Sequence, residues 1–99
     1  MDYLQELKNN REIFINYLRE KYHVIYNSNI FFREIQYGVL TYFEKKGIKL
    51  SYPKTEELTY QFAEILEETG ELVKMDNRTW KVNFKSENVV SESSADSNE

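Results

Sequence analysis

The sequence predicts a small α+β domain that is mostly helical, with about three helices followed by a C-terminal β-hairpin. Apolar residues recur at helical spacing in three segments that precede Gly70. After Gly70 the pattern changes to alternation on both sides of one short polar turn, which is typical of a hairpin. The 99 residues are enough for one domain and too few for two, so we assign a single domain to residues 1–85.

Residues 1–22 are expected to form the first helix. The Asn9-Asn10 pair is its weak point, because asparagine competes with the helix through local hydrogen bonds. The helix therefore bends there, or a second piece starts near Asn10. The apolar stripe favours packing into the core of the same chain, and the alternative is a dimerisation arm laid across a partner. The stripe consists of Leu4, Leu7, Phe14 and Leu18.

Residues 29–46 show the most regular helical period. Residues 23–26 favour a short strand or a buried loop before it, and residues 27–29 supply a turn and an N-cap. Gly38 lies in the middle of this helix, where glycine lowers the stability of the helix by about 1 kcal/mol relative to alanine. Either another helix approaches closely at Gly38 or the cost is simply tolerated. The period is carried by Phe32, Ile35, Val39 and Phe43.

Residues 48–52 alternate between apolar and polar side chains, which predicts a half-buried strand that could join the hairpin as a third strand. Pro53 then ends strand pairing and introduces a helix over residues 54–69. Gly70 is a natural C-terminal stop for this helix.

The hairpin is expected over residues 71–85, with a four-residue turn at residues 76–79. On the return strand, Trp80, Val82 and Phe84 share one face. On the first strand, Leu72 and Lys74 share a face, so that face is partly apolar and partly charged. The alternation therefore does not determine the register in which the two strands pair.

The negative charge of the chain belongs to its C-terminal tail. Residues 86–99 contain four acidic and no basic side chains, whereas the preceding 85 residues contain 13 of each kind. This polar tail cannot bury enough surface to offset its ordering entropy, so it is predicted to be a disordered acidic tail. The N-terminal residues lack the apolar run of a signal peptide, and no window is long enough to span a bilayer. We expect a cytoplasmic protein with no membrane partner.

The residue inventory argues against an enzyme. The chain has no cysteine and one histidine, and its three glycines are widely separated, so thiolate chemistry, a histidine-based relay and a phosphate-binding glycine loop are excluded. Glu64 shares a helix face with Glu67 or Glu68, but a solvated acidic face explains this better than a cation site. The sequence therefore indicates no catalytic residues, no cofactor, no metal and no small-molecule ligand.

A helix that runs directly into a hairpin, after two further helical segments, resembles the layout of a winged-helix domain over residues 29–85. In a winged-helix DNA binder, the helix before the hairpin enters the major groove and the hairpin, or wing, touches the backbone. The chain departs from that plan because residues 54–69 contain one basic and five acidic side chains, which is costly beside phosphates. The plan also places a short middle helix between the first strand and the recognition helix. In this chain only residues 47–53 are available for such a helix.

We therefore expect a non-catalytic protein–protein interaction or adaptor domain that acts as a homodimer or as a subunit of a larger assembly. Its predicted contacts are Glu57, Glu64, Glu68 and Trp80.

The alternative is a DNA-binding transcriptional regulator that docks through a basic hairpin. A second set of lysines, around the loop that precedes the acidic helix, would enlarge this surface if the two sets converged in space. A solvated sheet edge, on which lysines discourage aggregation, is the favoured explanation of the hairpin charges. The residues concerned are Lys74, Arg78, Lys81 and Lys85 in the hairpin, with Lys49 and Lys54 before it.

Overall fold

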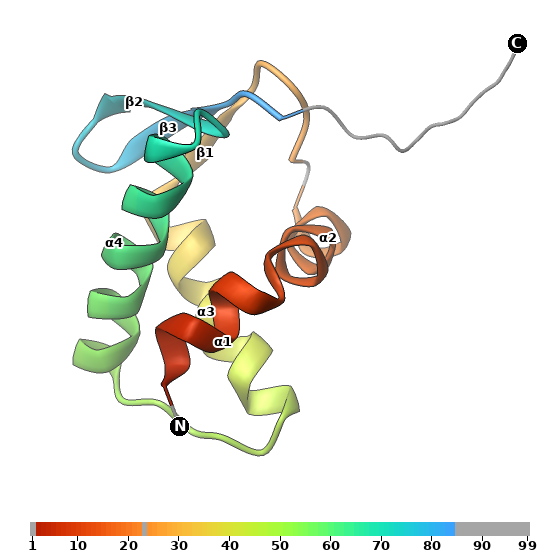
Figure 1. Cartoon of the computed structure of the whole chain (residues 1–99), viewed down its shortest axis with the longest axis vertical. Helices are drawn as coiled ribbons and strands as arrows, with labels where there is room; N and C mark the ends of the chain where they lie inside the picture. The colour runs from red at the N-terminus through yellow and green to blue at the C-terminus, as the bar shows by residue number, and fades with distance from the viewer. Residues whose placement is uncertain (1, 23, 85–99) are drawn as a thin grey trace, which may run out of the picture.

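The computed structural model describes residues 2–22 and 24–84, which form four helices and a three-stranded antiparallel sheet (Figure 1). The mostly helical α+β class is confirmed. His23, Lys85 and the acidic tail predicted for residues 86–99 lie outside the described residues. The helices are α1 (Tyr3–Asn9), α2 (Arg11–Lys21), α3 (Phe32–Lys45) and α4 (Tyr52–Glu68), and the strands are β1 (Asn29–Phe31), β2 (Leu72–Asp76) and β3 (Thr79–Val82).

The N-terminal helical segment is divided into α1 and α2 at Asn10. This residue has φ −117° and ψ 35°, outside the helical region, and its side-chain amide donates to the Glu6 carbonyl at 3.0 Å. The break lies where the asparagine pair predicts it. Leu7, Phe14 and Leu18 are all buried in the shared core, so the segment packs within its own chain and is not an arm laid across a partner.

The third strand comes from residues 29–31, not from residues 48–52. In β1, Ile30 lies opposite Trp80 of β3 and is buried. The helix predicted from residue 29 therefore begins at Phe32, and the Phe31 N–H, not an asparagine cap, donates to the Glu34 carboxylate at 3.0 Å. The apolar run at the start of α3 fits a helix as well as a very short buried strand, which is why the boundary predicted from the pattern is wrong.

Residues 48–51 form a loop that leads into α4. Ser51 is the N-cap of α4, and its hydroxyl accepts the Lys54 N–H at 3.3 Å, so the helix starts two residues earlier than predicted. Pro53 sits in the first turn, where its missing N–H has no cost. Gly70 follows the end of α4 with φ +84°, as expected of a glycine stop.

The sheet has the order β1-β3-β2, so the last strand of the fold is the central one. Trp80 and Val82 on β3 face the helices and are 2% and 1% exposed, which confirms the predicted apolar face at these two positions. Phe84 follows the end of β3 and is partly buried against the core. The turn is shorter than predicted, because Asp76 pairs with Thr79 and leaves only residues 77–78 as the connection. An irregularity in the pairing after Lys74 marks a bulge in β2.

Aromatic rings fill the centre of the core. The Phe14 ring on α2 meets Tyr42 on α3 and Phe62 on α4 edge to face, with centroids 5.4 and 5.3 Å apart. α2 crosses α3 at Gly38, where a Cβ atom would overlap a methyl group of Leu18. The close approach of another helix therefore accounts for this mid-helix glycine.

Burial of Tyr42 makes the stability of the fold sensitive to alkaline pH. Burial raises the pKa of the Tyr42 phenol above 10.0; the nearby Lys46 ammonium opposes the shift and Glu6 adds to it. The folded state then holds this proton more tightly than the unfolded state does, so the free energy of unfolding falls as the pH rises past 10.0. Tyr42→Phe is expected to reduce this alkaline loss in denaturant unfolding curves at neutral and alkaline pH.

The matched control for this prediction is Tyr52→Phe, since the Tyr52 side chain is 73% exposed. It is expected to leave the alkaline loss of stability unchanged. An alkaline loss in Tyr42→Phe as steep as in the wild type would contradict the prediction.

Candidate functional site

A groove of about 200 Å³ lies between α4 and the β2–β3 hairpin. The two walls are adjacent because only residues 69–71 connect them, and the Glu71 N–H returns to the Leu66 carbonyl at 2.9 Å. The groove brings together three of the residues that the sequence predicts for binding, namely Glu64, Lys74 and Trp80. Its lining consists of Tyr60, Gln61, Glu64 and Glu67 from α4 and Lys74, Asn77 and Trp80 from the hairpin.

Trp80 forms the floor of the groove and is a core residue. Only 2% of it is exposed, so most of this predicted contact residue lies in the core and little of its surface is left for a partner. Its indole N–H donates to the Glu67 carboxylate at 2.6 Å, which fixes that carboxylate in the wall. The role of Glu67 is not visible in the sequence, because it depends on a contact between two elements.

Tyr60 supplies the exposed aromatic surface of the groove. This residue is 41% exposed, and its ring lies on the buried Phe32 ring, with centroids 4.4 Å apart and an interplanar angle of 34°. The Arg78 guanidinium carbon lies 4.7 Å from the centroid of the same Phe32 ring. Helical spacing could have identified Tyr60, since it lies three residues after Glu57 and four before Glu64.

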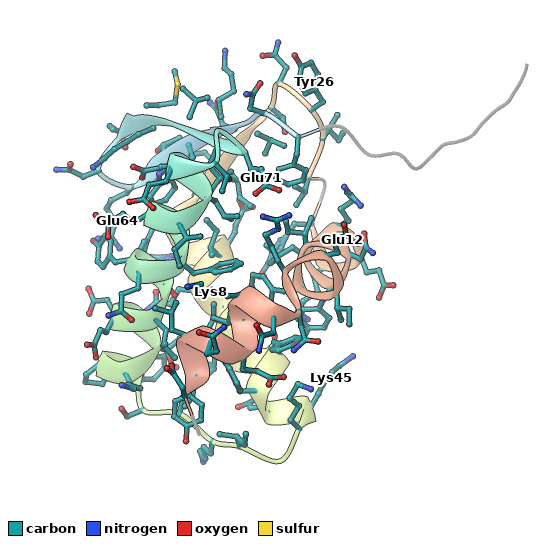
Figure 2. All side chains as sticks on the ribbon, in the orientation of Figure 1. Lys8, Glu12, Tyr26, Lys45, Glu64 and Glu71 are labelled. Carbon is teal, nitrogen blue, oxygen red and sulfur yellow. The ribbon has the colours of Figure 1, made fainter. Side chains whose placement is uncertain are left out.

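Glu64 and Lys74 place opposite charges in the same groove. Among the residues that the structure describes, neither side chain forms an ion pair or a hydrogen bond. Figure 2 shows Glu64 on α4 close to the sheet, whereas Glu12 lies on α2 at the other side of the molecule. Both charges of the groove are therefore available to a binding partner.

The predicted acidic face of α4 runs along the helix, and its members differ in their surroundings. Glu57 lies nearer the start of α4 and pairs with Lys54 at 3.7 Å. Glu68 is exposed in the last turn, about 16 Å further along the helix, close to where the hairpin begins. Glu64 and Glu68 therefore belong to the hairpin end, and Glu57 does not.

The basic residues predicted for a nucleic-acid contact are separated by the fold. Lys74 lies opposite Trp80 on the helix-facing side of the sheet, whereas Lys81 lies opposite Val73 on the outer side. The loop that carries Lys49 and the first turn of α4, which carries Lys54, lie at the end of α4 remote from the sheet (Figure 1). Among the described residues, the two sets of cations do not converge into one patch.

Two other surfaces expose large apolar side chains that the sequence does not single out. The outer face of the sheet carries Phe31 and Val73, with Met75 exposed at the bulge. A hollow of about 240 Å³ beside α3 includes Tyr37 and Tyr52. Neither surface contains any of the predicted acidic contacts, so the groove remains the best candidate site.

Within residues 2–22 and 24–84, no group of three or more acidic or histidine side chains could hold a metal ion, and no helix has the length and hydropathy of a membrane span.

No protein-family model, curated protein or solved structure matches the chain. The geometry of the groove is therefore the basis on which a function can be proposed.

Proposed function

We propose that the chain is a small, non-catalytic, cytoplasmic domain of winged-helix-like layout that binds another protein through the groove between α4 and the hairpin. The observation that carries this proposal is the half-exposed Tyr60 ring beside Glu64 and Lys74, whose charges have no ion-pair partner among the described residues. Tyrosines that are partly exposed and held rigidly are frequent energetic centres of protein interfaces.

The order of the elements supports the winged-helix-like description. With the first strand at residues 29–31, α3 occupies the place of the middle helix between that strand and α4. A strand at residues 48–52, as the alternation predicts, would leave no room for that helix. The hairpin that would serve as the wing follows α4 directly.

Charge placement favours a protein partner over DNA. The exposed face of α4 carries Glu57, Glu64 and Glu68, which would face phosphates if this helix entered a groove of DNA. On the hairpin, Lys81 points away from Lys74, and the Arg78 guanidinium already packs on Phe32. Within the described part of the hairpin, a wing-mediated regulator would therefore have few cations on its docking side.

The proposal is tested by capture of proteins from the native extract on immobilised full chain. Tyr60→Ala is expected to reduce recovery of the bound protein about tenfold, which corresponds to about 1.4 kcal/mol, because it removes the exposed ring from the interface. Tyr52→Ala is the matched control, since Tyr52 is an exposed tyrosine of the same helix that does not line the groove.

Circular dichroism melts establish that each variant is folded at the temperature of capture. Equal recovery by the Tyr60 and Tyr52 variants would place the binding surface elsewhere. Absence of any captured protein, together with a monomeric wild type, would refute the proposal. Retardation of DNA at low salt that is lost in Lys74→Glu would instead favour the wing-mediated alternative.

A further inference from the structure

We infer that the groove binds a second copy of this chain, in a two-fold dimer in which Glu64 of each protomer meets Lys74 of the other. This inference rests on the proposed function and names its partner. A two-fold interface uses the same patch on both subunits, so the patch must be complementary to itself. The groove meets this condition because one of its walls carries an anion and the other a cation, and neither is paired within the described residues.

The position of the symmetry axis follows from these charges. A two-fold axis that lies in the interface and runs along the groove, with Glu64 on one side and Lys74 on the other, exchanges the two positions and forms two ion pairs from one surface. An axis through the acidic face of α4 would instead oppose Glu64 and Glu68 to their own copies. A partner of a single charge sign would satisfy one wall of the groove and be repelled by the other.

The aromatic part of the groove supports the same arrangement. Tyr60 lines the groove together with both charges, and a two-fold mate would cover the exposed part of its ring. The ring rests on the buried Phe32, and the neighbouring Glu67 is fixed by the Trp80 indole. The binding surface is thus organised before association, which lowers the entropy lost on binding.

The test is sedimentation equilibrium of the full chain with charge reversals in the groove. Glu64→Lys and Lys74→Glu each replace both ion pairs with like-charge contacts, so each is expected to raise the dimer Kd at least about tenfold. The double variant Glu64→Lys/Lys74→Glu exchanges the signs and is expected to return the Kd to within about threefold of the wild type. Glu12→Lys, which makes the same charge change on α2, is the control and is expected to leave the Kd unchanged.

An equimolar mixture of the two single variants provides the decisive measurement. In the heterodimer, both contacts join a lysine of the Glu64→Lys chain to a glutamate of the Lys74→Glu chain, so two ion pairs form again. The mixture is therefore expected to associate where each single variant alone does not, and this readout also establishes that both variants are folded. A wild type that is monomeric at every concentration, or a mixture that associates no better than its components, overturns the inference.

The experiments distinguish failure of the dimer inference from failure of the proposed function. If the wild type is monomeric but the extract yields a protein that Tyr60→Ala no longer captures, the groove binds a different partner and only the inference of a second copy is wrong. If neither a dimer nor a captured protein is found, the proposed function fails as well.

Discussion

Replacement of Trp80 by alanine is expected to lower the free energy of unfolding by about 3–5 kcal/mol. The indole is 2% exposed and lies on the central strand, between Ile30 of β1 and Lys74 of β2. Its removal opens a cavity between the sheet and the helices, and the Glu67 carboxylate loses its indole donor. Urea unfolding followed by far-UV circular dichroism, which does not depend on tryptophan fluorescence, measures the loss.

Trp80→Phe separates the two contributions. This variant keeps most of the ring volume and removes the indole N–H, so a smaller loss of about 1–2 kcal/mol is expected. A loss below about 1 kcal/mol for Trp80→Ala would mean that the indole does not fill the core, and the floor assigned to the groove would be wrong.

Phe14→Ala is expected to have an effect of similar size, about 3–5 kcal/mol, because this ring joins three helices. It is fully buried and meets Tyr42 and Phe62 edge to face. The neighbouring Ile13 is 60% exposed, and Ile13→Ala is expected to change the free energy of unfolding by no more than about 0.5 kcal/mol. Denaturant unfolding of both variants at several protein concentrations measures the difference.

The pair of substitutions also tests how the N-terminal segment is packed. Equal effects of Phe14→Ala and Ile13→Ala would contradict the packing of α2 inside its own chain. A Phe14→Ala loss that grew at low protein concentration would indicate that the ring packs on a partner instead.

The helices and the hairpin could be predicted because their signals are local and redundant. In α3, the burial of Ile35, Val39 and Phe43 follows directly from their helical spacing. Gly70 stops α4 where a glycine stop is expected, and the alternation around Trp80 gives the buried face of β3. Each of these features needs information from only a few neighbouring residues.

The third strand and the groove could not be predicted in this way. β1 has three residues, too few to show alternation, and it becomes a strand only by pairing with β3, far away in the sequence. The separation of Lys74 from Lys81 and the fixing of Glu67 by Trp80 likewise depend on register and on packing between elements. Tyr60 differs from these features: the sequence prediction does not include it, although its helical spacing from the exposed Glu57 and Glu64 could have identified it.

The central position of β3 determines when the fold can be completed during synthesis. Within the part of the chain that the structure describes, β1 and β2 pair only with β3, so a nascent chain that has not yet produced residues 79–82 lacks the strand on which both of them form. Until then Ile30 and Leu72 lack their cross-strand neighbours on β3. Closure of the sheet therefore waits for the last of the described strands and requires a long-range contact between β1 and β3, which is the kind of contact that slows folding.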